Sequence, residues 1–400
     1  MDKLIILPSW CDSLGGMTVS LSMTIAGFAQ LQSLDRICVL VRRNSLLESY
    51  LQHLGQGVCL KSIDAANGHQ FYQRALIWIH RQPRADPLVL ENCTSRYLLP
   101  ILGRNIPRLR LSGRRIYHIF RDLAYSHNPG GRLLRKVIFT CLAPKAICNS
   151  QFTAQSVAKH LRLKIPGILY PPVDPERFSP RFHKTEPPSE LKPILASGAK
   201  LILTPSRISD PGHINDKNLR GLVQALAKLK QLGHYYHGVI IGQDYSPNQV
   251  NTRTLRSLAA QLDISERLTI LPPSFAIEDY YQYADVVVTL APREPFGRTV
   301  VEAIACGVPV IGSNTGGIGE ILNNFAPQWT VDPDQPLAVA QAIIRLTEDS
   351  QTSSVLTQGQ KWVASHCDPI KYVQRMMAII KIDNSATIQE QTISALVTKR

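Results

Sequence analysis

Several patterns that define special classes of protein are missing from this sequence. None of its eight cysteines forms a Cys-x-x-Cys pair, and most lie within apolar runs. Buried thiols in a reducing, cytoplasmic environment are therefore expected, rather than zinc ligands or disulfides. No stretch approaches the roughly 18 consecutive apolar residues of a membrane-spanning helix. The apolar residues 4–7 precede Pro8, and this run is too short for the core of a secretory signal. Any membrane contact is expected to be peripheral, at the inner face.

Acidic residues are scarce in the first part of the chain. Residues 1–172 contain 22 Lys and Arg but only 8 Asp and Glu, whereas residues 173–400 contain 22 of each kind. The whole net charge of +14 therefore belongs to residues 1–172, and it is densest over residues 104–136. A charge run is often only a solvated surface, but an excess confined to one domain favours an anionic partner: phospholipid, a lipid-phosphate acceptor or an acidic glycan. No nucleic-acid-binding motif accompanies the charge, so nucleic acid is not expected.

The chain is organised as two successive series of alternating elements. Short β-branched runs alternate with amphipathic segments throughout, which is the pattern of βα units and parallel sheets. Four hundred residues exceed what one core usually supports, so two domains are expected. A stretch rich in proline and charge separates the two series. We predict an N-terminal domain at residues 1–172, a linker at 173–199, a C-terminal domain at 200–368, a helix at 369–383 and a tail at 384–400.

Periodicity places the individual elements. Strands are predicted at residues 3–7, 36–41, 87–91, 116–120, 146–148 and 167–169, and in the second series at 201–204, 238–241, 268–271, 286–290 and 309–311. Helices are predicted at residues 17–30, 71–80, 153–161, 218–232 and 369–380. Parallel sheets bind ligands where the loops after the strands converge, so the chemistry is expected in these loops.

The most informative segment is residues 293–320, REPFGRTVVEAIACGVPVIGSNTGGIGE. A tight turn at residues 294–297 leads into a helical pattern that ends at Gly307. The first backbone N–H groups of such a helix have no intrahelical acceptor and attract anions. Glu294 lies in the turn and Glu302 in the helix, so two carboxylates flank this anion site. The arrangement suits a sugar joined to a nucleoside diphosphate; the alternative is two ordinary surface glutamates.

The segment resembles the Glu-x7-Glu signature of retaining glycosyltransferases of family 4, the glycosyl transferases group 1. That signature reads E-x-F-G, four residues, E-A-x-A-x-G-x-P-V and then GG-x-x-E, and residues 294–320 match it nearly throughout. The resemblance implies the GT-B fold, in which two Rossmann-like, doubly wound parallel-sheet α/β domains face a central cleft. In that fold a C-terminal helix often crosses back to the N-terminal domain, as residues 369–383 could.

The resemblance implies catalytic roles for three residues, two of them at the leaving group. Arg207 and Lys217 correspond to the family's R…K-G arrangement, although Asn218 replaces the usual glycine and residues 210–215 match no part of the pattern. Two fixed cations stabilise the negative charge that develops on the departing diphosphate, so neither a metal ion nor another cofactor is expected. Glu294 is implied to contact the donor sugar.

The remaining donor contacts implied by the resemblance are made mostly by backbone. Glycines in a strand-to-helix loop let bare backbone approach a phosphate, and the loop after a later strand lines the base. Glu302 is implied to bind the ribose hydroxyls, and the turn before it to bind sugar hydroxyls and the β-phosphate. The implied donor-binding residues are Gly15, Gly16, Gly242, Leu271, Phe296, Gly297, Arg298, Thr299 and Glu302.

The acceptor side is predicted in the first domain, where family members often place a His-Asp pair after a late strand. This chain reads HIFRD over residues 118–122. Asp122 matches the aspartate, but Arg121 occupies the place of the histidine and could itself bind donor or acceptor oxygens. His118 falls on the strand, with its ring expected in the interior, and it stays an acceptor-side candidate together with His127.

Two further motifs are expected to be local structure. Asp332-Pro333-Asp334 has the Asp-x-Asp spacing of metal-dependent glycosyltransferases, but it lies between a strand and a helix. We expect a loop and a helix N-cap there, not a metal site. Ser150, in the N-S-x-F motif at residues 149–152, is expected to be a helix N-cap.

These features predict transfer of a hexose-type sugar from a nucleoside-diphosphate sugar to an acceptor hydroxyl, with retention at the anomeric carbon and without a metal. The acceptor is expected to be a glycan or a lipid-linked molecule. Two alternatives share the fold: a catalytically idle sugar-nucleotide-binding protein and an epimerase. An idle protein is expected to have lost Arg207, Lys217 or Glu302, and all three are present.

Overall fold

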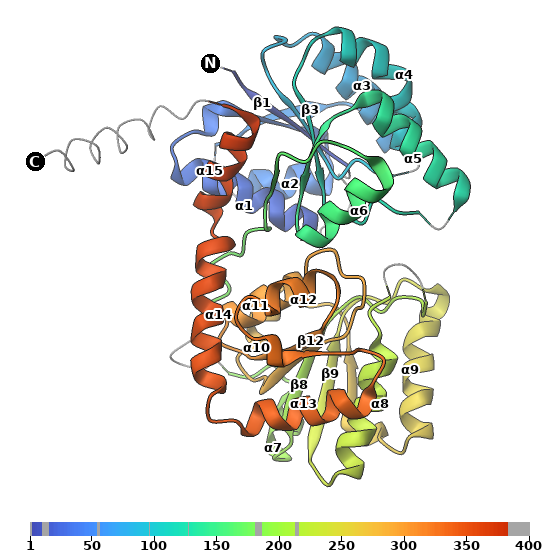
Figure 1. Ribbon diagram of the computed structural model, residues 1–400, viewed down its shortest axis with the longest axis vertical. Coiled ribbons are helices and arrows are strands. Elements are labelled where there is room, and N and C mark those ends of the chain that lie inside the picture. The colour runs from blue at the N-terminus through green and yellow to red at the C-terminus, as the bar shows by residue number, and fades with distance from the viewer. Residues whose placement is uncertain are drawn as a thin grey trace, which may run out of the picture. The chain divides into compact units, whose positions relative to one another are not determined.

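The computed structural model describes residues 2–9, 16–53, 57–95, 97–126, 128–180, 186–212 and 216–382. These residues form two compact units (Figure 1). Unit 1 comprises Met1–Asn149, Ala154–Pro172 and the segment that begins at Pro369, and unit 2 comprises Ser150–Thr153 and Val173–Asp368. Each unit is built on one parallel sheet packed with helices. The prediction of two α/β domains with parallel sheets is therefore confirmed.

Unit 1 contains a sheet of seven strands among the described residues, in the order β3-β2-β1-β4-β5-β6-β7. Every neighbouring pair is parallel. The strands are β1 (Leu4–Pro8), β2 (Ile37–Arg42), β3 (Cys59–Ile63), β4 (Leu88–Glu91), β5 (Ile116–Phe120), β6 (Lys145–Cys148) and β7 (Gly167–Ile168). The helices are α1 (Gly16–Gln30), α2 (Leu46–His53), α3 (Gly68–His80), α4 (Leu98–Leu111), α5 (Pro129–Leu142), α6 (Gln151–Leu161) and α15 (Pro369–Ile380).

Unit 2 contains a sheet of six strands in its described part, in the order β10-β9-β8-β11-β12-β13, again all parallel. The strands are β8 (Lys200–Pro205), β9 (Tyr236–Ile241), β10 (Leu268–Leu271), β11 (Val286–Thr289), β12 (Val310–Ser313) and β13 (Thr330–Val331). The helices are α7 (Lys192–Ala196), α8 (Leu219–Gln231), α9 (Val250–Gln261), α10 (Ile277–Tyr281), α11 (Arg298–Ala305), α12 (Gly316–Leu322), α13 (Pro336–Glu348) and α14 (Thr352–His366).

Burial on both faces explains why the central strands are continuous apolar runs. All five residues of β1 and all six of β9 are buried, as parallel sheets covered by helices on both faces require. The helices are one-sided instead. In α8, Leu222, Leu226 and Leu229 are buried, whereas Gln224 on the same helix is exposed, which is the period of a helix that covers a sheet.

Every predicted strand forms, and its ends lie within two residues of the predicted ones. Strand β3 was not predicted, because Lys61 and Ser62 interrupt its apolar run and only Ile63 is buried. Helices α4 and α5 were not predicted either, since several arginines and Pro107 obscure their apolar faces. The stretch expected to be a linker, residues 173–199, clusters with unit 2 and contains α7.

Helix α15 packs on α1 inside unit 1. A Cβ atom on Gly27 would lie 2.4 Å from the carbonyl oxygen of Pro369 and 2.7 Å from a methyl group of Val373, so only glycine permits this crossing. Arg115 donates to the carbonyl oxygens of Ile380 at 3.0 Å and Lys381 at 2.9 Å, which satisfies acceptors that a helix end leaves open. The helix after Asp368 is thus a part of the core of unit 1.

Three global properties bear on function. Four of the seven described cysteines are buried. No helix in the described part of the chain is long and apolar enough to cross a membrane. Among the same residues, no group of three or more His, Cys, Asp or Glu is placed to hold a metal ion.

Candidate functional site

The predicted donor-site residues of unit 2 lie at the carboxyl ends of four strands. Arg207 follows β8, Gly242 follows β9, Leu271 ends β10, and the turn that contains Glu294 follows β11. These strands are consecutive in the sheet, in the order β10-β9-β8-β11. Parallel strands bring their carboxyl ends to one edge. The topology therefore gathers residues from positions 207 to 297 at a single edge of unit 2.

Lys217 and Glu294 form an ion pair at this edge: Nζ of Lys217 donates to Oε2 of Glu294. The two side chains are 18% and 22% exposed, so the pair is partly buried yet open to a ligand. Asn218 positions the lysine with a left-handed φ of 49°, and its side chain donates to the carbonyl oxygen of Pro333 at 2.7 Å. Asparagine tolerates this conformation better than most residues. Asparagine can therefore adopt this left-handed conformation at the place where the family pattern has glycine.

Glycines hold the turn before α11 in place. Gly317 donates its N–H to the carbonyl oxygen of Glu294 at 2.7 Å. A Cβ atom on Gly317 would lie 2.3 Å from the carbonyl oxygen of Phe296, and one on Gly316 would lie 2.9 Å from that of Glu294. The two glycines of the GG-x-x-E motif are thus required by backbone packing. They fix the turn that carries Glu294.

The N-terminus of α11 is suited to an anion. Its N-cap is Gly297, with a φ of 103° and no side chain to cap the helix, and its first turn contains no acidic residue. The backbone N–H groups at the start of a helix attract negative charge. Oγ1 of Thr299 donates to the carbonyl oxygen of Pro205 at 3.4 Å, which ties this helix to the end of β8. Phe296 is buried beneath the turn.

Glu302 lies one turn into α11, with its carboxyl group largely buried. Nη1 of Arg298 lies 3.5 Å from Oε1, and the hydroxyl of Tyr281 donates to Oε2 at 3.5 Å. Burial raises the pKa of Glu302, and the opposing effects of Arg298 and Arg177 do not cancel it. Hydroxyl donors would therefore stabilise the ionised form. Sequence patterns did not single out Tyr281, because its contact with Glu302 joins two elements with no common motif.

Gly242 joins the ends of three strands. A Cβ atom there would lie 1.9 Å from the carbonyl oxygen of Ser206, after β8. The N–H of Gly242 donates to the carbonyl oxygen of Leu271, at the end of β10, at 3.1 Å. Both residues thus shape the floor of the site through their backbone. In unit 1, Gly16 begins α1, and Gly15 lies outside the described residues.

The structure corrects the acceptor-side assignment of His118. Its ring is fully buried and packs against Phe120 and Phe139, at ring-centroid distances of 4.0 and 4.9 Å. Burial lowers the pKa of His118 to about 3, so the ring is neutral at physiological pH. A side chain enclosed in the core cannot contact an acceptor. Its interior position, expected from its place on the strand, is confirmed.

Arg121 also faces the protein. Its guanidinium forms an ion pair with the buried carboxylate of Glu91, and Nη2 lies 3.5 Å from the hydroxyl of Tyr372. The side chain of Arg121 is only 9% exposed and that of Glu91 only 3%. Breaking a buried ion pair of this kind strongly destabilises a fold. Asp122 is exposed and accepts from Nδ2 of Asn92 at 2.7 Å. His127 lies outside the described residues.

The two motifs expected to be local structure form a turn and a helix N-cap. Oδ1 of Asp332 accepts from the N–H of Asp334 at 3.0 Å, which confirms the loop, but the N-cap of α13 is Gln335 rather than an aspartate. Oγ of Ser150 accepts from the N–H of Thr153 at 2.9 Å, which confirms the predicted N-cap of α6.

Comparison with known proteins identifies a matching family model and individual relatives. Residues 195–361 match the family model of glycosyl transferases group 1. The D-inositol 3-phosphate glycosyltransferase of Streptomyces bingchenggensis is 25% identical over 232 residues, which cover 55% of this chain and 49% of that protein. Its namesake from Salinispora tropica is 31% identical over 144 residues, or 34% of this chain and 30% of that protein. The matched region thus spans half or less of the length of these relatives.

Solved structures resemble the whole chain. Anabaena HepE in complex with UDP and glucose has a TM-score of 0.75 at 18% identity, covering 95% of this chain and 99% of that one. Sucrose-phosphate synthase from Thermosynechococcus elongatus has a TM-score of 0.71 at 17% identity, covering 98% and 100%. Likeness at such low identity shows the fold, and it confirms the predicted GT-B fold.

Proposed function

We propose that this chain transfers a sugar from a nucleoside-diphosphate sugar to an acceptor hydroxyl, because residues 195–361 match the family model of glycosyl transferases group 1. The observation that carries the proposal is the Lys217–Glu294 pair beside the uncapped N-terminus of α11. One cation, one carboxylate and a row of backbone donors meet there. These are the groups that a diphosphate bonded to a sugar requires.

The reaction would proceed at this edge with retention of the anomeric configuration. Arg207, Lys217 and the first turn of α11 stabilise the charge that develops on the leaving diphosphate, and this stabilisation is worth most in the transition state. Glu294 accepts hydrogen bonds from the donor sugar, and the buried carboxylate of Glu302 accepts from the ribose hydroxyls. The departing phosphate takes the proton of the acceptor hydroxyl on the same face. No step requires a metal ion or cofactor.

A uridine nucleotide is the donor that the comparisons favour. HepE of similar fold has been solved with UDP and with UDP-glucose, and a trehalose-6-phosphate enzyme of Escherichia coli with UDP-2-fluoro glucose. We therefore propose a UDP-hexose as donor. The test is a thermal-shift titration with UDP, GDP, ADP and dTDP, each with and without EDTA. A bound nucleotide at a hundredfold excess over its Kd stabilises the fold by about 2.7 kcal/mol.

A shift with UDP that EDTA does not remove supports a metal-independent donor site. No shift with any nucleotide, or one abolished by EDTA, contradicts the proposal. Incubation with UDP-hexoses and NMR of the product's anomeric proton then separates the alternatives. A retained glycoside supports transfer, an epimerised donor supports an epimerase, and UDP binding without turnover on any acceptor supports an idle binding protein.

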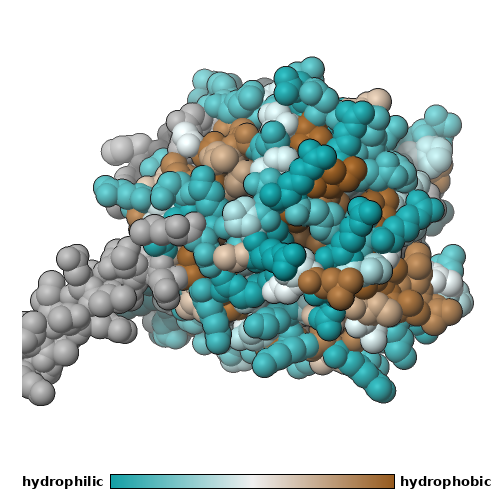
Figure 2. All heavy atoms as spheres, turned by 90° about the horizontal axis from the view of Figure 1, so that it is seen from above, coloured by the Kyte–Doolittle hydropathy of each residue, from teal (hydrophilic) through white to brown (hydrophobic). Residues whose placement is uncertain are grey.

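We further propose an acceptor held at an anionic membrane, on the evidence of helix α5. Arg132, Leu133, Lys136 and Val137 are all exposed and recur at the spacing of one helical stripe. Leu133 is 64% and Val137 is 49% exposed. Figure 2 shows apolar side chains exposed among hydrophilic ones on the molecular surface. Cationic and apolar groups combined on one stripe suit a surface of anionic lipid.

A further inference from the structure

A cavity of about 240 Å³ opens beside Arg207 in unit 2. Its walls come from the loop after β8, which contributes Arg207 and Asp210, from the segment between β9 and α9, which contributes Tyr245 and Ser246, and from Asn251 at the start of α9. Sites for drug-sized ligands occupy roughly 300–1,000 Å³. This cavity therefore has room for a ligand of a single ring.

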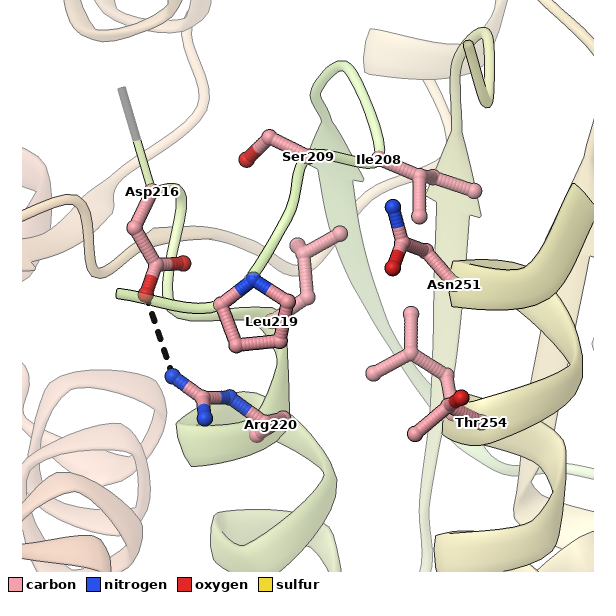
Figure 3. Close-up of a pocket in the computed structure, with 9 residues that line it drawn as sticks. Ile208, Ser209, Asp216, Leu219, Arg220, Asn251 and Thr254 are labelled. Carbon is pink, nitrogen blue, oxygen red and sulfur yellow. Dashed lines mark hydrogen bonds and ion pairs between the residues drawn. The ribbon is translucent and has the colours of Figure 1, made fainter. Parts of the chain in front are cut away.

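A smaller hollow lies next to it, between α8 and α9 (Figure 3). That hollow measures about 20 Å³ and shares Ile208, Ser209 and Asn251 with the larger cavity. Its other side is formed by Asp216 and Arg220, which make an ion pair at 3.0 Å. A volume of this size is close to that of one water molecule. The two adjoin along the loop after β8, and we refer to them together as the groove.

The wall on the β9 side is held rigidly. The buried carboxylate of Asp244 accepts from the N–H and Oγ of Ser246 at 2.9 and 2.6 Å, and from the N–H and Oγ1 of Thr252, both at 2.8 Å. Burial raises the pKa of Asp244, but these four hydrogen bonds outweigh it and lower the pKa. Ile208 forms a bridge with Asp244 that joins the two walls. A groove fixed in this way is organised before a ligand binds.

The polar groups of the wall include donors and acceptors. Nδ2 of Asn251 donates to Oδ1 of Asp210 at 2.8 Å. A carboxylate and an amide hold more donors and acceptors than one bond uses. The side chain of Arg207 is exposed, and Tyr245 is 76% exposed at the rim. The charged residues that line the cavity, Arg207 and Asp210, have opposite signs, so the lining has no net charge. Such a lining suits neutral hydroxyl groups, which both donate and accept hydrogen bonds.

We propose that this cavity is a saccharide-binding subsite for one pyranose ring. The apolar face of the ring rests on Tyr245, as amphipathic aromatic side chains allow. Its hydroxyls bond to the Asp210–Asn251 pair and to Arg207, whose five N–H donors can serve a diphosphate and a hydroxyl together. The subsite goes beyond the proposed function, which assigns no residue to any sugar other than that of the donor.

The test is saturation-transfer NMR on the full chain with the methyl glycosides of glucose, galactose, mannose and N-acetylglucosamine, each with and without saturating UDP. At least one glycoside is expected to bind in the presence of UDP. Tyr245→Ala and Asn251→Ala should each weaken that binding about tenfold, the scale of one aromatic or hydrogen-bonded contact. Tyr245→Phe, which keeps the ring, and Tyr97→Ala, which removes an exposed tyrosine of unit 1, should leave it unchanged.

The outcomes that overturn the subsite are distinct from those that overturn the transferase. Three results would contradict the subsite while a nucleotide-induced shift still supports the donor site. They are no glycoside signal, a glycoside signal that UDP abolishes, and a glycoside signal that Tyr245→Ala does not alter. A glycoside signal that depends on Tyr245 without any nucleotide shift removes the proposed donor site only. An unchanged nucleotide shift in Tyr245→Ala shows that this variant is folded.

Discussion

The two units share an architecture but place their polar residues differently. In unit 2, Lys217 and Glu294 are paired at a loop edge where a ligand can reach both. In unit 1, Arg121 and Glu91 are paired in the interior, at the loop where the family pattern places acceptor contacts. The same kind of pair is thus open in one unit and enclosed in the other. Position relative to solvent, rather than residue type, separates the candidate site from the framework.

The charged residues of the N-terminal part also differ in their exposure to solvent. The net charge of +14 belongs entirely to residues 1–172, yet the arginines of this part have contrasting roles. Arg114 is buried and donates to the carbonyl oxygens of Asp86, Ile79 and Gln82, whereas Arg132 is exposed on α5. A count of charges alone therefore overstates the surface available to an anionic partner.

The substitution Arg121→Ala tests most directly whether the buried pair of unit 1 is structural. The substitution leaves Glu91 as an unpaired buried carboxylate, so we expect a loss of about 3–5 kcal/mol in the free energy of unfolding, measured by urea denaturation. The matched control is Arg43→Ala, which breaks an ion pair whose side chains are 53% and 69% exposed and should cost at most about 1 kcal/mol. Unchanged stability with lost transfer would instead make Arg121 a ligand-binding residue.

The corresponding change in unit 2 is Lys217→Ala. We expect transfer to fall about a hundredfold or more, as when one preorganised charge is removed from a transition state, while the nucleotide-induced thermal shift falls less. Lys192→Ala is the control, because Lys192 pairs with Glu186 at the surface, where the side chains are 51% and 79% exposed. Full activity in Lys217→Ala would refute its assignment to the leaving group.

The two units also differ in how much of their structure could be predicted from the sequence. The strands were predictable because burial on both faces leaves long apolar runs, and the turn at residues 294–297 because its motif is continuous. That Lys217 and Glu294 belong to one site followed from topology and the family pattern together, but their ion pair was not predicted. The partners of Arg121 could not be predicted, since Glu91 and Tyr372 come from distant segments. The groove beside Arg207 could not be predicted either, because it depends on loops that match no common pattern.

Glu302→Gln tests whether unit 2 sacrifices stability for its site. Because burial raises the pKa of Glu302 in the fold, its ionised form is disfavoured there, and the stability of the native chain falls as pH rises through the interval above the ordinary glutamate pKa. The variant is expected to melt a few degrees higher near neutral pH and equally at acid pH. Its nucleotide-induced shift should shrink. A lower melting temperature at neutral pH would mean that the contact with Arg298 outweighs burial.

The smallest expected effect concerns the exposed stripe of α5 in unit 1. Lys136→Glu should weaken sedimentation with phosphatidylglycerol vesicles at least about fivefold at low salt, since each cation near an anionic surface contributes about 1 kcal/mol. Leu133→Ser should weaken it by loss of apolar contact and should be less sensitive to salt. Lys228→Glu, on α8 of unit 2, is the control for a change of net charge alone. Equal losses in Lys136→Glu and Lys228→Glu would show that overall charge, and not this stripe, governs binding, because only a local surface can distinguish two lysines of the same chain.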